Sequence, residues 1–168
     1  MRTLSVYIGH TTMLDEIDRN IVAMMQLDAT LAYADLGERV GLSASTINDR
    51  LKRLRAKGVI RRVSAEIDPH ALGLDLMVIV LVEVSGRAEE LAFIAAMQAV
   101  PAVMECHHVA GEFSYLLKVR VASTAAYEAF LDRHLKTLAG IRRTQSLIAL
   151  SSAKDSRVLP SAASVEVG

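Results

Sequence analysis

Some residue types are scarce in this 168-residue chain, and each shortage excludes something. Cys106 is the single cysteine, so no disulfide can form within the chain, and the sequence suits a reducing compartment. Tryptophan is absent and phenylalanine occurs three times, so a core must be built mainly from aliphatic side chains. The longest apolar run, Leu76 to Val82, is far shorter than the roughly 20 residues that a membrane-spanning helix needs. These shortages predict a globular protein without a membrane partner.

The first twelve residues lack the features of a secretory signal. Arg2 is their only charged residue, and they contain neither the long apolar stretch nor the cleavage site of a leader peptide. We therefore expect a cytoplasmic protein, and we assign residues 1–12 no function. A hydrophobic fraction of 52% argues against disorder, and the length allows two small domains.

Positive charge is concentrated in one segment, although basic and acidic residues each number 19. Seven cations and no acid lie between Arg50 and Arg62, whereas three acids crowd positions 15–18. A net charge of zero does not by itself favour a nucleic-acid partner. The segregated basic stripe from Arg50 to Arg62 does favour one.

A first helix is predicted from Leu14 to about Leu27. Its apolar residues recur at the helical period, and acids in its first turn suit the positive end of the helix dipole.

A helix-turn-helix pattern follows. Residues 35–40 predict a short helix that Gly41 ends, because glycine readily adopts the left-handed conformation found after helix C-termini. Ser43 can cap a third helix through its hydroxyl, and that helix ends at Gly58. In such motifs the second helix of the pair enters the DNA major groove by its N-terminal residues.

This geometry assigns roles to the polar side chains of the third helix. Short ones near its start can reach base edges, and cations farther along can meet phosphates, with an affinity that falls as salt rises. The candidate base-contacting residues are Ser45, Thr46, Asn48 and Arg50, with Ser43 and Asp49 beside them. The candidate phosphate-contacting residues are Arg53, Lys57, Arg61 and Arg62. Residues 59–63 are predicted to form a short wing strand. A basic helix face is often only a solvated surface, so a three-helix domain that does not bind DNA stays open on this pattern alone.

The second half has the order of a ferredoxin-like domain. Pro69 and Gly73 interrupt the apolar pattern, and we place a linker at 64–73. The predicted elements are a strand at 76–84, a helix at 88–99, strands at 102–109 and 114–121, a helix at 124–138 and a strand at 141–150. The predicted fold class is α+β, with a helix-turn-helix (winged-helix-like) domain at 13–63, a βαββαβ domain at 74–152 and a flexible tail at 153–168.

The first strand of this domain predicts an oligomer. It is apolar at every position from Leu76 to Val82, yet the helices of this fold cover one face of the sheet. Large exposed apolar patches are rare on monomers, so we expect at least a homodimer. Two recognition helices about 34 Å apart could then read a palindromic site.

These motifs together resemble the Lrp/AsnC (leucine-responsive/asparagine, feast/famine) family of transcriptional regulators, over about residues 13–154. The resemblance is carried by Leu14-Asp15-x-x-Asp18-x-x-Ile21, Val40-Gly41-Leu42-Ser43, Arg50-Leu51-x-x-Leu54-x-x-x-Gly58-Val59-Ile60, Asp68-Pro69 with Leu72-Gly73, Val109-x-Gly111 with Tyr115, and Leu138-x-Gly140 with Thr144. It implies a dimer, often assembled into tetramers or octamers, that binds double-stranded DNA and responds to a small molecule, commonly an amino acid.

The resemblance also implies an effector site between dimers, formed by the loop after the second strand and the start of the last strand. The residues at those places are Gly111, Glu112, Phe113, Ser114, Tyr115, Thr144 and Ser146. Relatives often carry an acid at the place of Ser114, and a hydroxyl offers an ammonium group only a neutral hydrogen bond, about half as strong. Either Glu112 compensates for this difference or the effector is a different one.

Two other kinds of site are not expected. Glu105-Cys106-His107-His108 contains metal-ligating residue types, but neighbouring side chains on a strand point to opposite faces, so we expect no metal. Catalytic and nucleotide-binding motifs are absent, so we expect no enzyme and no cofactor. The sequence thus predicts an effector-responsive, sequence-specific DNA-binding regulator. An architectural DNA-binding protein without effector stays open, as does a small-molecule-binding module without DNA, against which the basic stripe argues.

Overall fold

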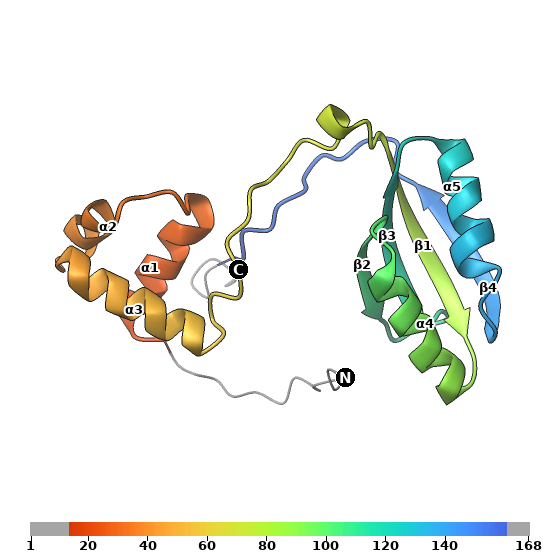
Figure 1. The fold of residues 1–168 in the computed structure, drawn as a ribbon, viewed down its shortest axis with the longest axis horizontal. Helices are drawn as coiled ribbons and strands as arrows, with labels where there is room; N and C mark the ends of the chain where they lie inside the picture. Colours follow the sequence, from red (N-terminus) through yellow and green to blue (C-terminus); the bar gives the residue numbers. More distant parts are fainter. Residues whose placement is uncertain (1–13, 161–168) are drawn as a thin grey trace, which may run out of the picture. The chain divides into compact units, whose positions relative to one another are not determined.

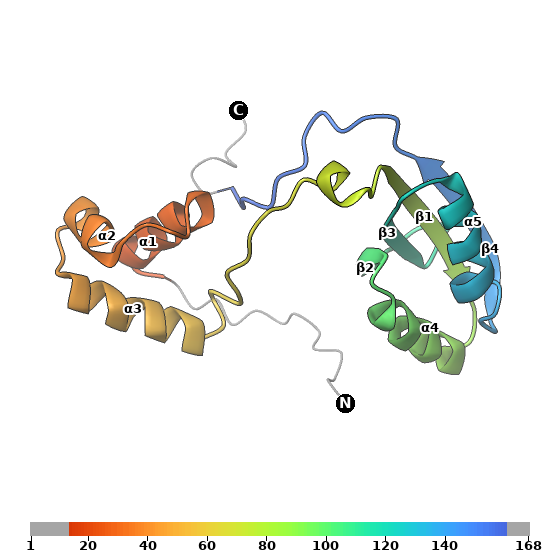
Figure 2. The same ribbon diagram turned by 45° about the horizontal axis from the view of Figure 1, so that its top comes forward.

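The computed structural model describes residues 14–160, which divide into two compact units (Figure 1, Figure 2). One unit consists of 14–65 together with 156–160, and the other of 66–155. Residues 1–12, to which no function was assigned, and 161–168 of the predicted flexible tail lie outside the described residues. In the part of the chain that the structure describes, no helix is long and apolar enough to cross a membrane.

The first unit contains the three predicted helices, α1 (Glu16–Leu27), α2 (Tyr33–Val40) and α3 (Ala44–Ala56). The Asp15 carboxylate caps α1 by accepting a hydrogen bond from the Asp18 amide at 2.6 Å. The predicted cap of α3 is confirmed, because the Ser43 hydroxyl accepts from the Thr46 amide at 3.2 Å. A small aliphatic core joins the helices. Its fully buried members are Ile21, Leu36, Ile47, Leu51 and Leu54.

The turn between α2 and α3 depends on close backbone approach. A Cβ atom added to Gly37 would lie 2.3 Å from the Leu42 carbonyl oxygen, which is too close for any side chain. Gly41 ends α2 in the left-handed conformation at φ 71°, as the sequence predicts. These two glycines set how closely α3 follows α2.

The predicted wing strand at 59–63 is wrong. Residues 57–60 turn, and 61–68 have no regular secondary structure. Val59 and Ile60 pack instead against the helical core, and no second strand of this unit lies among residues 14–65 to pair with them.

The second unit is the predicted βαββαβ domain. Its elements are β1 (Leu76–Val84), α4 (Arg87–Ala99), β2 (Val103–His108), β3 (Tyr115–Val121), α5 (Thr124–Phe130) and β4 (Ile141–Ile148), after a short helical turn η1 (His70–Leu72). The strands form an antiparallel sheet in the order β2-β3-β1-β4. Both helices cover the same face (Figure 2).

The core of this unit lies between that face and the helices. Burial alternates along β1, as expected for a strand covered on one face, and Val78, Val80, Val82 and Val84 are buried. Phe93 and Met97 of α4, and Tyr127, Phe130 and Leu135 near α5, pack on them. The continuous apolar run in β1 therefore supplies one buried face and one face that no helix within residues 14–160 covers.

The second helix and last strand are less regular than predicted. α5 ends at Phe130 and continues as a π-helical turn, η2 (Leu131–Leu135), in which the Lys136 amide donates to the Leu131 carbonyl at 2.9 Å. β4 is two residues shorter than predicted and contains a register shift opposite Glu83 and Val84.

Residues 149–160 follow β4 without regular secondary structure, apart from isolated bends. Asp155 pairs with Lys118 of β3 at 3.1 Å. The Leu159 amide donates to the Gln26 side chain of α1 at 2.8 Å.

Candidate DNA-binding and effector-binding sites

The start of α3 presents a group of short polar side chains. Ser45, Thr46 and Asp49 are exposed, and Asn48 is half-buried. The Ser43 hydroxyl lies 2.9 Å from that of Ser45 and 2.8 Å from that of Thr46. The predicted base-contacting residues therefore lie together at the N-terminal end of the recognition helix, with the exception of Arg50.

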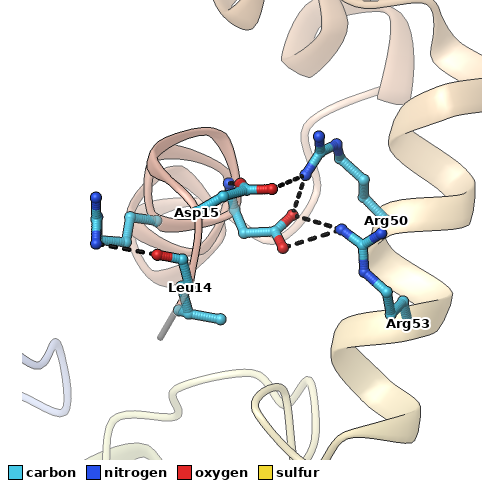
Figure 3. A network of polar contacts seen from close by, with 6 residues as sticks. Leu14, Asp15, Arg50 and Arg53 are labelled. Atoms are coloured by element: carbon cyan, nitrogen blue, oxygen red, sulfur yellow. Dashed lines mark hydrogen bonds and ion pairs between the residues drawn. The ribbon is translucent and has the colours of Figure 1, made fainter. Parts of the chain in front are cut away.

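Arg50 belongs to an ion-pair network between α3 and the start of α1 (Figure 3). Its Nη1 lies 2.7 Å from both Asp15 Oδ2 and Asp18 Oδ1. Arg53, one turn farther along α3, reaches the same Asp18 carboxylate at 3.0 Å. Asp18 is only 6% exposed and is the one buried charged residue within 14–160. Two cations of α3 thus clamp one buried carboxylate of α1.

This network changes the electrostatics of the basic stripe. The hydrogen bond from Arg50 lowers the pKa of Asp15, and the Asp18 backbone amide lowers it further. Hydrogen bonds to Asp15 and Asp18 raise the pKa of Arg50. The Arg50 side chain is 19% exposed and faces α1, so the structure does not present it with the other predicted base-contacting residues.

The other cations of the stripe remain on the surface. Lys57, Arg61 and Arg62 are exposed, and none of them pairs with an acid in the described chain. Arg53 is 47% exposed despite its contact with Asp18. These four are the predicted phosphate-contacting residues.

The predicted effector residues do not form one cluster. Ser114 donates a hydrogen bond to the Val84 carbonyl at 3.3 Å, so its hydroxyl is bonded to β1. Tyr115 is 3% exposed and packs in the core, with its ring 4.9 Å from that of Phe93. Burial raises the pKa of Tyr115.

Arg143 of β4 holds the loop that contains Gly111 and Glu112. Its Nη2 donates to Glu112 at 2.6 Å, its guanidinium carbon lies 4.4 Å from the centre of the Phe113 ring, and its Nε lies 3.6 Å from Glu83. Glu112 already has a strong partner, and its hydrogen bond is the main reason that the pKa of Arg143 is raised.

Thr144 and Ser146 belong to the opposite side of β1. Thr144 and Tyr115 both pair with Val82, from opposite edges of that strand, so they are two strand spacings apart, roughly 10 Å. Ser146 shares a 2.5 Å hydrogen bond with the Tyr127 hydroxyl of α5. Within one chain, therefore, Ser114 and Tyr115 lie on the other side of β1 from Thr144 and Ser146.

Comparisons with known proteins agree with this architecture. Residues 14–61 match the family model for a winged helix-turn-helix DNA-binding domain, and residues 77–159 match the model for the Lrp/AsnC ligand binding domain. The chain is 36% identical over 148 residues to the leucine-responsive regulatory proteins of Salmonella typhimurium and Escherichia coli, covering 87% of this chain and 90% of each relative. The chain belongs to the Lrp/AsnC family.

Solved structures of Lrp/AsnC regulators have the same fold. A transcriptional regulator from Neisseria meningitidis in complex with L-methionine is 30% identical with a TM-score of 0.83, covering 88% of this chain and 96% of that one. A feast or famine regulatory protein from M. tuberculosis, also in complex with L-methionine, is 37% identical with a TM-score of 0.79, covering 86% and 97%. This chain is thus a DNA-binding transcriptional regulator of the Lrp/AsnC type, and the alternative of a module without DNA binding is wrong.

No group of three His, Cys, Asp or Glu side chains that could hold a metal lies within residues 14–160 of this Lrp/AsnC regulator. Glu105 and His107 lie on one face of β2, 3.1 Å apart, while His108 stacks on Tyr115. The hydrogen bond from His107 lowers the pKa of Glu105, and Lys118 lowers it further.

Sequence reasoning missed three residues that organise the candidate sites. Asp15 and Asp18 were interpreted as first-turn acids, and Arg143 was not singled out. The only available signal for the aspartates was their spacing, since positions i and i+3 share one side of a helix and two basic residues at the same spacing occur in α3. Nothing local indicates the partners of Arg143, because they come from β1 and from the loop before β3.

Proposed function

We propose that this Lrp/AsnC regulator binds DNA as a homodimer by inserting the start of α3 into the major groove, and that its second domain responds to an amino acid. The observation that carries the proposal of DNA binding is the exposed polar start of α3. The ion pairs of Asp18 with Arg50 and Arg53, called here the Asp18 clamp, anchor this helix to α1. A rigid recognition helix keeps the base-contacting groups in a defined position, which specificity requires.

The structure supports separate roles along α3. We assign base contacts to Ser45, Thr46, Asn48 and Asp49, and the cap to Ser43. Phosphate contacts fall to Arg53, Lys57, Arg61 and Arg62. Arg50 is reassigned from base contact to positioning, because its guanidinium is occupied by Asp15 and Asp18.

The uncovered sheet face supports a dimer. Its central apolar residues are Met77, Ile79, Leu81, Leu116 and Leu147. Leu147 is 47% exposed, and the three residues of β1 are only half-covered. Burying this face against a second copy removes apolar surface from water and yields the two-fold symmetry that a palindromic DNA site requires.

The amino-acid response rests on the relatives and on the loop before β3. Two relatives were solved with L-methionine, and the ligand binding domain spans the second unit of this chain. Ser114 is bonded to the β1 backbone, so we assign recognition of the effector ammonium to Glu112, which would exchange Arg143 for the ligand. In this assignment Glu112 compensates for the missing acid at position 114.

Selection of sites from a randomised DNA pool, followed by fluorescence anisotropy, tests the DNA-binding roles. Asn48→Ala should change the preferred base at one position, with little effect on binding to random DNA. Lys57→Gln should weaken binding to all sequences and lower the slope of log K against log salt by about 1. Arg87→Gln, which neutralises an exposed cation at the start of α4, is the matched control. Equal losses for Asn48→Ala on selected and random DNA would contradict the assignment.

A thermal-shift screen against the twenty amino acids tests the response, starting with L-methionine. A ligand that binds only the folded state adds about 2.7 kcal/mol to the free energy of unfolding at 100 times its Kd. The thermal midpoint rises as a result. Glu112→Gln should abolish the shift. A screen without any shift would favour an architectural DNA-binding protein that needs no effector.

We place the protein in the cytoplasm with the DNA it regulates, and we assign it no enzymatic activity, in keeping with a family of transcriptional regulators.

A further inference from the structure

The recognition helix carries one acid on the side that points away from the core. Asp49 is the single acidic residue between Glu38 and Glu66, a stretch that contains eight cations. Asp49 lies two positions from both Ile47 and Leu51, which are fully buried. Residues two positions apart on an α-helix lie on roughly opposite sides of it, since each residue turns about 100°. The Asp49 carboxylate is therefore at the middle of the surface that α3 would present to DNA.

The fold itself gains little from this carboxylate. The Asp49 side chain is 78% exposed, and its ion pair with Lys52 is long, with 3.9 Å between Oδ1 and the ammonium nitrogen. Exposed pairs of this kind contribute little to stability. Ser43 already caps α3, and Asp49 lies in the second turn, where the benefit that a carboxylate gains from the helix dipole has faded. Aspartate is also a poor residue for a helix interior.

A carboxylate on this surface acts on the choice of DNA sequence. DNA phosphates repel it, so it weakens binding unless a base offers it a hydrogen-bond donor. In the major groove the donors are the amino groups of cytosine and adenine, whereas guanine and thymine present acceptors. Asp49 therefore favours cytosine or adenine at the position it faces and penalises the other two bases.

Lys52 decides between these two bases. It lies one turn after Asp49 with its side chain 67% exposed, whereas the neighbouring Arg50 and Arg53 are bound to Asp18. In a C·G pair the cytosine amino group lies beside guanine O6 and N7, two adjacent acceptors that an ammonium group can bond together. In an A·T pair the two acceptors lie on opposite sides of the adenine amino group, so an ammonium group reaches one of them. An acid with a lysine beside it therefore matches C·G better.

We propose that Asp49 and Lys52 together read one C·G base pair in each half of the DNA site. Asp49 accepts a hydrogen bond from the cytosine amino group, and Lys52 donates to guanine O6 and N7. Because their own ion pair is long and exposed, little is lost when both groups turn to the bases. This inference rests on the insertion of α3 into the major groove proposed above, and it adds the base pair that is read and the role of Lys52.

Selections from a randomised DNA pool test this with the full chain and its variants in parallel. Sites selected by the original chain should share a C·G pair at one position of each half-site. Asp49→Ala should accept any base there. Asp49→Asn should prefer adenine there, because an asparagine amide can donate to adenine N7 and accept from its amino group. Preferences at the other positions should stay the same.

Fluorescence anisotropy measures the size of the effect. Replacing this C·G pair by A·T in the selected site should weaken binding of the original chain about tenfold, and binding of Asp49→Ala much less. Lys52→Gln should reduce the discrimination at the same position, and the losses of Asp49→Ala and Lys52→Gln should not add, since both residues contact one base pair. On random DNA Asp49→Ala should bind more tightly than the original chain, because a repelling charge is gone.

Glu38→Gln is the matched control, since it neutralises an exposed acid of α2 and should leave every base preference unchanged. Thermal midpoints show that all variants are folded. Sites that stay the same in the Asp49 variants overturn this inference alone and leave the proposed DNA binding in place. A changed position that carries a base pair other than C·G in the original sites overturns it as well. An original chain that selects no sequence overturns the proposed mode of DNA binding, and this inference with it.

Discussion

Arg50 Nη1 and Asp18 Oδ1 lie 2.7 Å apart and join the recognition helix to α1 across 32 positions of the sequence. Asp18 is buried and receives a second guanidinium, that of Arg53. In the proposed mode of DNA binding, α3 has to be held at a fixed angle to present its polar start to DNA, so this ion pair would connect the stability of the first domain to its function.

Asp18→Ala should destabilise the helix-turn-helix by about 2 kcal/mol and weaken binding to every DNA sequence. Removing one partner of a fully buried pair costs about 3–5 kcal/mol, and the partial exposure of Arg50 and Arg53 reduces that figure. Glu16→Ala, in the same first turn and exposed, is the control. Urea denaturation measures the free energy of unfolding of both variants. Equal stability of the two would show that the clamp is only a surface contact.

Asp15→Asn should make the stability of this domain less sensitive to acid. Asparagine keeps the cap of α1 but loses the charge that Arg50 binds. Arg50 lowers the pKa of Asp15 below the unfolded value of about 3.9, so the unfolded chain binds more protons in this range. The stabilisation is complete at neutral pH and is lost as the pH falls through the folded pKa.

Thermal midpoints measured from pH 7 to pH 3 follow this effect. At pH 7 the thermal midpoint of the original chain should be higher than that of Asp15→Asn. This difference in midpoint should shrink on acidification. Asp35→Asn is the control, since it removes an exposed acid of α2 that forms no ion pair in the described chain and leaves the partners of Arg50 in place. A gap for Asp15→Asn that widens toward pH 3 would contradict the assignment.

Gly37→Ala should destabilise the first domain by about 1–3 kcal/mol, the usual cost of overpacking. The sign is informative, because replacing glycine by alanine inside a helix normally stabilises it by up to about 1 kcal/mol. Here the new Cβ would meet the Leu42 carbonyl oxygen at 2.3 Å and push α3 away from α2. Ala34→Gly, at an exposed position of the same helix, should destabilise by the ordinary propensity difference of about 1 kcal/mol. A stabilised Gly37→Ala would refute the close approach.

Leu81→Glu should convert the proposed dimer to a monomer. Leu81 lies at the centre of the uncovered sheet face, opposite Leu116 of β3, and a charge there would be buried in a symmetric interface without a partner. Leu91→Glu provides the control, since Leu91 is an exposed leucine of α4, 51% accessible. Sedimentation equilibrium gives the mass of each variant. Unchanged mass for Leu81→Glu would place the interface elsewhere.

The local elements were predictable because short-range rules govern them. The helical period of Ile47, Leu51 and Leu54 predicted α3, and Ser43 predicted its N-terminal cap. Gly41 predicted the end of α2. The strands of the second unit were predictable from runs of β-branched residues between turns. The wing strand was not, because a strand needs a hydrogen-bonding partner, and Val59 and Ile60 instead found apolar cover on the helices.

The candidate sites were only partly predictable. A helical surface pattern placed Ser45, Thr46 and Asn48 together, since these residues share one end of one helix. The same pattern could not show that Arg50 turns toward Asp15 and Asp18, because a guanidinium on a long side chain takes whichever carboxylate packing brings within reach. In the same way, only the structure shows that the Ser114 hydroxyl is bonded to the Val84 carbonyl and that the Glu112 carboxylate is bonded to Arg143.

The sequence by itself determined the helix-turn-helix, the βαββαβ order, the family and the basic stripe, since each depends on residues close together along the chain. The tertiary structure alone decided which charges of that stripe remain available for DNA and which are paired internally. Such pairing depends on distances between segments that only packing brings together.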